Sequence, residues 1–294
     1  MSAKADEEIR HSAGNRRVVQ HGRASTTSSI ADAIVIKHDE LFFLCNSNGD
    51  VPCEGSNGLG LYYHDCRYLN GYELRLGDAT ADRLLSTAAA GSSATFELTN
   101  RDANTAGGKL LEKERIGIRW ERTLDASERA LHDSIAFSNF GVEAADLPIT
   151  IRLRSDFEAL FAVRGAQPRK RGKLTPPRWA DSTLHFAYEG ADKVRRSLAA
   201  AFEPAPRQTG DSTAAFNLVI EPQTTKTIRL SLHIGESSTE QETKAPPPSV
   251  AHREHITRAR EAQNKAGDEW AANAAHLSSD DPHLDRVVDR KSVV

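Results

Sequence analysis

Two short segments of this chain gather residue types that bind or cleave polar ligands. The first is rich in glycine and asparagine and contains Tyr62, Tyr63, Asp65 and Arg67. Tyrosine rings stack on the apolar faces of sugars, while carboxylates and guanidinium groups exchange hydrogen bonds with hydroxyls. On a strand, Asp65 and Arg67 would share a face, so they can equally form an ion pair that pins the segment. Strand alternation also indicates that at least one tyrosine of this segment belongs to the core.

The second segment places Asp156 two residues before Glu158. On one face of a strand such residues lie about 6.6 to 6.8 Å apart, which is compatible with the roughly 6.5 to 9.5 Å between the carboxylates of inverting glycosidases. The segment is also rich in apolar residues, so its charges can instead flank a buried turn, with Arg164 as the partner of Asp156. The spacing permits a hydrolytic pair without requiring one.

The sequence predicts neither a metal site nor a cofactor. Its three cysteines, Cys45, Cys53 and Cys66, have no CxxC spacing, and its 11 histidines form no HxH or HExxH pattern. A zinc site built from these cysteines and His64 is the weaker alternative to unbound thiols. An odd number of cysteines leaves at least one unpaired, which fits a reducing cytoplasm.

The composition is that of a globular protein, with 38% hydrophobic and 27% charged residues. A net charge of -3 gives no electrostatic reason to expect nucleic acid or an anionic membrane as a partner. Apolar runs all fall short of the roughly 20 residues that span a bilayer. We therefore expect a soluble cytoplasmic protein.

Short strands separated by turn residues account for most of the chain. We predict strands at 33–37, 41–45, 72–76, 83–89, 94–99, 110–122, 131–137, 147–153, 184–188, 194–202, 216–220 and 226–234. Apolar and polar residues alternate most regularly in 147–153 and 226–234, as in half-buried antiparallel strands. The pattern predicts an all-β fold, a large antiparallel β-sandwich.

The composition changes at Pro246, where three consecutive prolines indicate a stiff linker. We predict a disordered tail at 1–29, the sandwich at 30–245, and the linker with a connecting helix at 246–280. A second helix at 281–294 has Pro282 in its first turn and an apolar stripe that needs a partner.

Two motifs resemble the N-terminal domain of bacterial glycogen-debranching-like proteins of the amylo-alpha-1,6-glucosidase type. Residues 58–69, GLGLYYHDCRYL, are similar to that family's G-L-Y/F-x-x-D-T-R-x-L segment, which runs into a strand like YELRL at 72–76. Residues 155–165, SDFEALFAVRG, are similar to its A-D-F-x-D-L-F-E-V-R-G segment, and Arg171-Gly172 follows. The likeness extends over roughly residues 33–290 and includes Asp285-Arg286 and Asp289-Arg290.

The resemblance implies a sandwich of the glucoamylase N-terminal type preceding an (α/α) toroid that carries the catalytic carboxylates. The chain would then contain only the first helix of that domain, which would make it truncated. Three positions depart from the family pattern, because its Thr is Cys66, its Asp is Ala159 and its Glu is Ala162. Any role of those carboxylates does not transfer.

We therefore expect a non-catalytic sandwich that supports and shapes the active site of a helical glycoside hydrolase domain. An α-glucan or oligosaccharide and that helical domain would be its partners, and Tyr62, Tyr63, Asp65, Arg67 and Arg164 would form the substrate or interface loop. The alternative is a standalone carbohydrate-binding or assembly module. No catalysis is expected from this chain alone, with Asp156 and Glu158 as the weak candidates.

Overall fold

The computed structural model of the protein describes residues 30, 32–88, 91–105, 107–108, 110–166 and 170–238, with isolated positions between 250 and 280. The tail predicted at 1–29 and the helix predicted at 281–294 lie outside the described residues. So does most of the predicted linker and connecting helix at 246–280, although the described positions 257, 261, 264–265, 267–269 and 272–273 are helical.

Nineteen strands and one short helix make up the described fold between residues 34 and 238. They are β1 (Ile34–His38), β2 (Leu41–Cys45), β3 (Gly60–Tyr63), β4 (Cys66–Leu69), β5 (Gly71–Leu76), β6 (Asp82–Thr87), β7 (Ser93–Thr99), β8 (Ala103–Asn104), β9 (Leu110–Leu111), β10 (Ile116–Asp125), β11 (Ala130–Asn139), β12 (Ala145–Arg154), β13 (Glu158–Ala159), α1 (Leu160–Val163), β14 (Lys173–Ala180), β15 (Thr183–Glu189), β16 (Val194–Glu203), β17 (Gln208–Thr209), β18 (Thr213–Ile220) and β19 (Thr225–Ser238). No described helix is long and apolar enough to cross a membrane.

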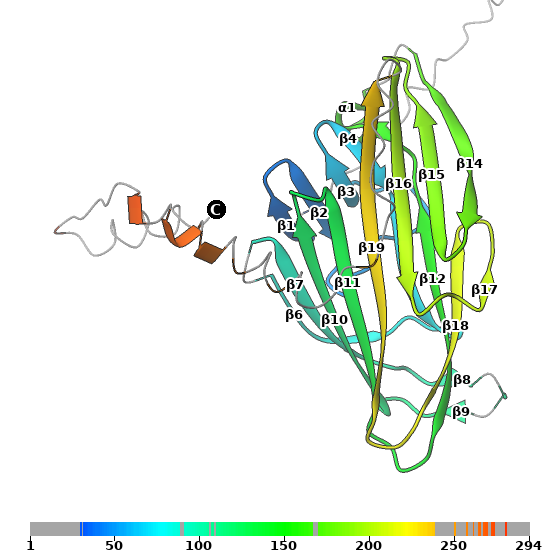
Figure 1. Ribbon diagram of the computed structural model, residues 1–294. Helices are drawn as coiled ribbons and strands as arrows, with labels where there is room; N and C mark the ends of the chain where they lie inside the picture. The colour runs from blue at the N-terminus through cyan, green and yellow to red at the C-terminus, as the bar shows by residue number, and fades with distance from the viewer. Residues whose placement is uncertain are drawn as a thin grey trace, which may run out of the picture.

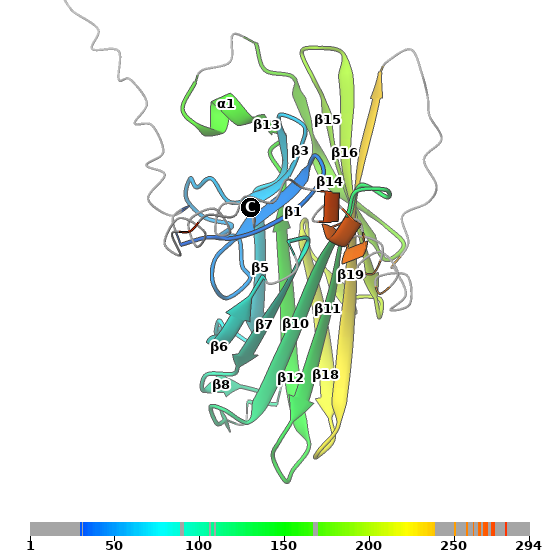
Figure 2. The same cartoon turned by 90° about the vertical axis from the view of Figure 1, so that its left-hand side faces the viewer.

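The strands form antiparallel sheets that pack as a sandwich (Figures 1 and 2). One layer is an eight-stranded sheet in the order β14-β15-β16-β19-β11-β10-β7-β6. Facing it are the four-stranded sheet β17-β18-β12-β5 and the five-stranded sheet β1-β2-β3-β4-β13. Strand β18 contacts β11 and β19, while β1 contacts β7 and β10, and β4 contacts β16. The predicted all-β sandwich is confirmed.

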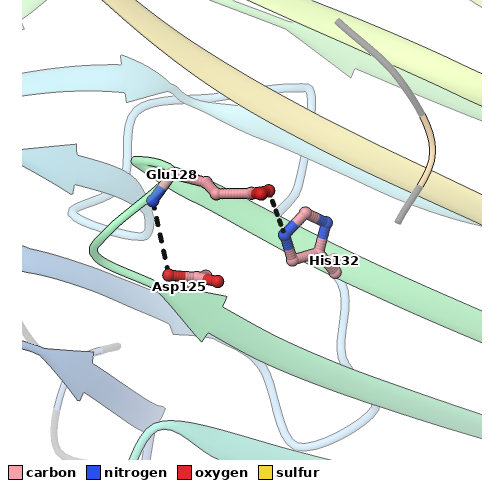
Figure 3. Close-up of side chains that lie close together, drawn as sticks. All are labelled: Asp125, Glu128 and His132. Atoms are coloured by element: carbon pink, nitrogen blue, oxygen red, sulfur yellow. Dashed lines mark hydrogen bonds and ion pairs between the residues drawn. The ribbon is translucent and has the colours of Figure 1, made fainter. Parts of the chain in front are cut away.

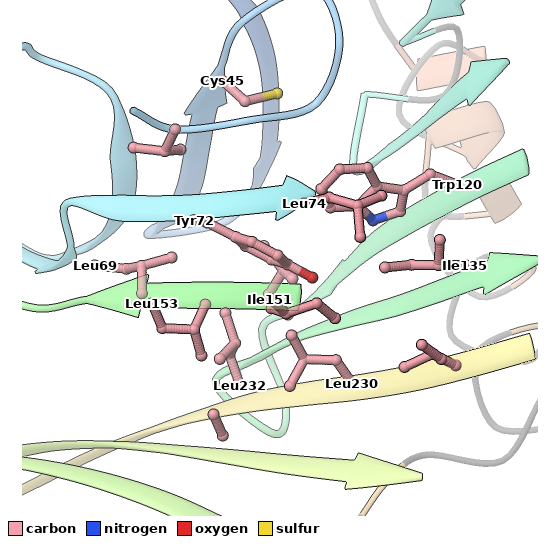
Figure 4. Close-up of a cluster of buried hydrophobic side chains, with 14 of the residues drawn as sticks. Cys45, Leu69, Tyr72, Leu74, Trp120, Ile135, Ile151, Leu153, Leu230 and Leu232 are labelled. Carbon is pink, nitrogen blue, oxygen red and sulfur yellow. The ribbon is translucent and has the colours of Figure 1, made fainter. Parts of the chain in front are cut away.

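Alternation along the long strands builds the core between these layers. On β12, Leu147 and Ile151 are fully buried while Arg152 points to solvent, as predicted. On β19, Leu230 and Leu232 are fully buried. Figure 4 shows side chains from β5, β10, β11, β12 and β19 meeting in one cluster. The strict period of two therefore identified the correct inward faces.

Two predicted segments differ from the observed elements. The stretch predicted as one strand at 110–122 is two strands, because a turn that includes Glu114, with φ of 62°, separates β9 from β10. The stretch between β2 and β5, predicted as a loop, contains the hairpin of β3 and β4. Every residue of these two four-residue strands is buried, so the alternation that marks a half-buried strand is absent.

Candidate functional site

A cavity of about 670 Å³ opens beside the β3–β4 hairpin. One wall consists of the β3–β4 turn and the segment from Asp156 through α1. The other wall comes from the eight-stranded sheet, with Tyr188 of β15, Arg196 of β16 and Glu236 of β19. The two sequence motifs at 58–69 and 155–165 therefore meet at one site, although about 90 residues separate them. In Figures 1 and 2 this end of the sandwich lies opposite the β11–β12 turn.

The hairpin that forms the first wall is made tight by its glycine. Gly60 has φ of 135°, and a Cβ atom at this position would lie 1.9 Å from the carbonyl oxygen of Leu69. A two-residue turn, His64-Asp65, then joins β3 to β4, and both turn residues are exposed at the cavity. Only glycine permits this close approach, which explains Gly60 of the motif.

The tyrosines predicted as a sugar-stacking platform are core residues. Tyr62 is 2% exposed and Tyr63 is 9% exposed. The Tyr62 ring stacks on Phe42 with a centroid distance of 4.7 Å, and its hydroxyl donates to the carbonyl oxygen of Gly58 at 2.8 Å. Because a ring buried in this way offers no free face, neither tyrosine can stack on a sugar. The platform interpretation of this segment is wrong.

A buried ion pair clamps the two motifs together. Arg67 of β4 donates from Nε to Asp156 Oδ1 at 3.3 Å, and its Nη2 atom bonds Asp156 Oδ2. Its Nη1 atom donates to the carbonyl oxygen of Asn57 at 2.6 Å. Burial alone would lower the pKa of Arg67, but the hydrogen bond and charge of Asp156 outweigh it and the pKa is raised. The guanidinium thus stays charged.

This clamp replaces the two ion pairs that the sequence suggested. Arg67 pairs with Asp156 and not with Asp65, which lies exposed in the β3–β4 turn. Arg164 is exposed beyond the end of α1, so it is Arg67 that serves as the partner predicted for Asp156. The clamp aligns β13 with β4, and in the backbone register of these strands Glu158 lies opposite Arg67. Leu160 N also donates to the Asp65 carbonyl oxygen at 2.7 Å.

Removing the clamp should loosen the cavity wall. We expect Arg67→Met to lower the free energy of unfolding by about 2 to 3 kcal/mol, because it leaves Asp156 mostly buried without its cation. Arg67→Lys should recover only part of this loss, since an ammonium cannot make the two-pronged contact. Urea unfolding and the hydrogen-exchange rate of the Leu160 amide measure both effects.

The exposed pair Arg229–Glu203 provides the matched control. Arg229→Met should change the free energy of unfolding by less than about 1 kcal/mol, because the two side chains are 37% and 51% exposed and water screens the pair. If the hydrogen-exchange rate of the Leu160 amide were the same in Arg67→Met as in the native chain, the clamp would not hold the cavity wall in place.

Asp156 and Glu158 both line the cavity but are not the extended pair that the sequence suggested. Phe157 between them has φ of 49°, so the segment is not a regular strand and the strand spacing does not apply. Arg67 engages Asp156, and Arg171 Nη2 donates to Glu158 Oε1 at 2.7 Å. Each carboxylate is thus held by a guanidinium, an arrangement that favours structure over hydrolysis.

The opposite wall holds charged groups that sequence reasoning missed. Glu236 Oε1 accepts a hydrogen bond from the Tyr68 hydroxyl at 2.6 Å and lies 3.4 Å from Arg196 Nε. Arg196 also makes a two-pronged contact with Asp192, whose pKa is lowered chiefly by that hydrogen bond. Burial and then the bond to Glu236 raise the pKa of Tyr68. Glu236 lies 168 residues after Tyr68 in the sequence, so no local pattern indicated that the two side chains would meet.

The three cysteines behave as buried thiols. All three are unpaired and at most 7% exposed. Burial raises the pKa of Cys66, which lines the cavity, to about 12, so the thiol stays protonated at neutral pH and is a poor nucleophile or metal ligand. Among the described residues, they form no cluster with His64 that could hold a metal ion.

Exposed apolar side chains lie next to the cavity. Phe161 on α1 is 66% exposed, and Leu174 on β14 is 49% exposed and lines the opening. The helix α1 buries none of its own residues. Together with the charged walls, these side chains form a surface that can receive either a hydroxyl-rich ligand or another protein domain.

The chain is similar to solved structures of known proteins. Among the solved structures, a candidate kojibiose phosphorylase from the human microbiome matches 84% of this chain at 11% identity, with a TM-score of 0.50. The match covers 34% of that protein, so the chain spans about a third of its length. A candidate aldose 1-epimerase from Escherichia coli K12 matches 69% of this chain and 98% of its own length, at 8% identity and a TM-score of 0.40. At 11% identity, the likeness to the phosphorylase shows the shared fold alone.

The sequence itself identifies the family. No curated protein sequence matches the chain. Residues 36–231, however, match the family described as the N-terminal domain of (some) glycogen debranching enzymes. This stretch contains both motifs and the whole clamp between them. The chain therefore belongs to the family of N-terminal domains of glycogen debranching enzymes.

Proposed function

We propose that this sandwich is a non-catalytic domain that supports and shapes the active site of a helical glycoside hydrolase domain acting on an α-glucan or oligosaccharide. The family match supports a role beside a glucan-processing enzyme. Within the sandwich, the carboxylates that could have formed a hydrolytic pair are each engaged by an arginine. The catalytic carboxylates would then belong to the helical domain.

The observation that carries the proposal is the placement of exposed apolar residues beside the cavity. Phe161 projects from a helix that has no buried residue, and Leu174 lies across the opening. Large apolar side chains exposed at the edge of a cavity are typical of surfaces that another protein element covers. The Arg67–Asp156 clamp fixes this surface to the core. We infer that the helical domain packs over α1 and closes the cavity.

The test mixes the full chain with the helical catalytic region of a glycogen debranching enzyme from which its own N-terminal domain has been removed. We expect the chain alone not to hydrolyse α-1,6-linked glucosides at an enzyme-like rate. The mixture should form a complex in analytical ultracentrifugation and hydrolyse faster than the helical region alone. Phe161→Ser should weaken the complex by at least about tenfold, since aromatic anchors dominate interfaces.

Phe140→Ser is the matched control. Phe140 is 64% exposed, almost the same as Phe161, but follows β11 at the opposite end of the sandwich. This variant should bind as the unmodified chain does. Hydrolysis by the chain alone, or equal effects of the two serine variants, would contradict the proposal.

The alternative function is a standalone carbohydrate-binding or assembly module. The cavity supports it, because Arg196, Asp192 and Lys170 offer donors and acceptors to sugar hydroxyls. Retarded migration of the chain in a glycogen affinity gel, without any helical domain, would favour this alternative. Lack of retardation would remove it.

The domain division and the cellular setting remain parts of the same proposal. A tail at 1–29, a linker with a connecting helix at 246–280 and a further helix at 281–294 would join the sandwich to the helical domain. Three unpaired, buried thiols support a reducing, cytoplasmic setting.

A further inference from the structure

We propose that Asp125, Glu128 and His132 form a binding site for a divalent transition-metal ion, with Zn²⁺ as the best-suited ion. The three residues lie at the β10–β11 hairpin, outside the cavity described above. One ligand atom from each lies within 4.8 Å of the others. Figure 3 shows the Glu128 carboxylate and the His132 ring facing one another across the turn, with Asp125 beside them.

The hairpin register places these side chains together. Asp125 ends β10 opposite Ala130, and His132 lies on β11 opposite Thr123. The turn residue Glu128 lies between them in sequence and is four residues before His132. Ser127 N, Ser127 Oγ and Glu128 N all donate to Asp125 Oδ1, at 2.6 to 3.3 Å, and so fix the Asp125 carboxylate.

His132 is held in the orientation that a metal ligand requires. Its side chain is 2% exposed, and its Nδ1 atom lies 2.8 Å from Ser231 Oγ of β19. When Nδ1 carries the proton and donates to Ser231, the lone pair of Nε2 points toward Glu128. Metal-binding histidines are typically oriented by such a bond from the second ring nitrogen. His233 also packs edge-on against the His132 ring, with centroids 5.8 Å apart.

The distances fit a shared ion better than a direct hydrogen bond. His132 Nε2 and Glu128 Oε2 are 3.6 Å apart, which is longer than a hydrogen bond. Nitrogen and oxygen ligands about 2.0 to 2.2 Å from Zn²⁺ stand roughly 3.3 to 3.6 Å apart in a tetrahedron. The Glu128 side chain is 40% exposed, so it has room to adjust its position relative to the other two ligands. Water would complete the coordination.

The chemistry of the donors selects the ion. Two carboxylates around one buried imidazole make a site of net negative charge, which a divalent cation neutralises. The nearest described guanidinium in the turn, that of Arg129, lies over the Tyr63 ring at 5.5 Å. Ca²⁺ and Mg²⁺ prefer all-oxygen sites, whereas an imidazole ligand suits Zn²⁺. Because the histidine bonds to β19, the ion would connect the hairpin turn to the centre of the eight-stranded sheet.

Zinc titration of the tag-free full chain tests the site. Isothermal titration with ZnCl₂ should show one saturable site per chain, and Zn²⁺ should raise Tm, because an ion that binds only the folded chain stabilises it. Glu128→Gln should weaken zinc affinity at least tenfold while leaving Tm without metal unchanged, because Glu128 is exposed at a turn. His132→Gln should abolish binding. CaCl₂ should give no saturable binding.

Glu114→Gln is the matched control, since Glu114 also lies at an exposed turn and its side chain is 71% exposed. Zinc affinity should be unchanged in this variant. Absence of saturable zinc binding would overturn the proposal. Binding that survives Glu128→Gln unchanged would overturn it as well, because the zinc would then be held elsewhere on the chain, and so would equal affinities for Ca²⁺ and Zn²⁺.

Discussion

Replacing Arg122 by methionine should lower the free energy of unfolding by about 3 to 5 kcal/mol. Arg122 of β10 and Asp133 of β11 lie directly opposite one another, and both side chains are fully buried. Two parallel hydrogen bonds of 2.9 and 2.8 Å join them. Methionine fills much of the space but leaves a buried carboxylate without its cation, and that desolvated charge is the main cost. Urea unfolding followed by circular dichroism measures the loss.

The surroundings of Arg122 add to this effect. Its guanidinium lies 4.3 Å from the Phe43 ring centroid and 4.5 Å from that of Trp120. Burial alone would lower the pKa of Arg122, but the charge and hydrogen bonds of Asp133 raise it, so the group stays charged inside the aromatic cluster. Arg122 Nη1 also donates to the carbonyl oxygen of Gly49 at 2.8 Å, which connects the sheet to the turn after β2.

Two further variants separate charge from packing. The double variant Arg122→Met with Asp133→Leu should recover at least half of the lost stability, because no buried charge remains. Arg119→Met, on the same strand, should cost less than about 1 kcal/mol, since the Arg119 side chain is 55% exposed and its ion pairs are screened. A loss as small for Arg122→Met as for Arg119→Met would mean that the buried pair contributes little.

The regular strands could be predicted because burial on one face leaves a pattern in the sequence. Leu147 to Leu153 and Ile228 to Ile234 alternate with polar residues, and the structure buries these apolar side chains. Arg122 is an exception to this pattern. It is a charged residue at the end of the strand predicted at 110–122, where exposure to solvent is expected, but the structure buries it. Its burial depends on a partner across the hairpin, and single-strand periodicity contains no information about that pairing.

The candidate site was predictable only in part. The motif residues Asp65, Asp156 and Glu158 do line one cavity, whereas Arg67 and Tyr62 are buried behind it. The strands of a fully buried hairpin show no alternation of apolar and polar residues. The sequence therefore did not indicate which motif residues face the cavity and which are buried behind it. The second wall comes from Tyr188, Arg196 and Glu236, which follow Asp156 by about 30 to 80 residues. These residues belong to another sheet, and the packing of the two sheets brings β16 beside β4.

Asp50 should make the protein less stable as the pH rises from about 4 to about 7. Its side chain is buried, and burial raises the pKa of Asp50 from 3.8 to about 7, although the hydrogen bond from Leu74 N opposes the shift. The folded chain therefore holds this proton more tightly than the unfolded chain does. Unfolding releases the proton within that window, so the free energy of unfolding falls with rising pH. Three pKa units correspond to about 4 kcal/mol, as an upper value.

Asp50→Asn isolates this contribution, because an amide keeps an acceptor for Leu74 N but does not ionise. The variant should match the native chain near pH 4 and exceed its stability by about 2 to 4 kcal/mol near pH 8. Asp78→Asn, at an exposed position, should leave the pH profile unchanged. Parallel profiles of the native chain and Asp50→Asn would contradict the assignment.

Arg122 lowers the pKa of Asp50 by its charge, so Arg122→Met should raise that pKa further and extend the pH-dependent loss above pH 7. The two buried acids, Asp50 and Asp133, are therefore expected to depend on one cation, and their variants should be non-additive.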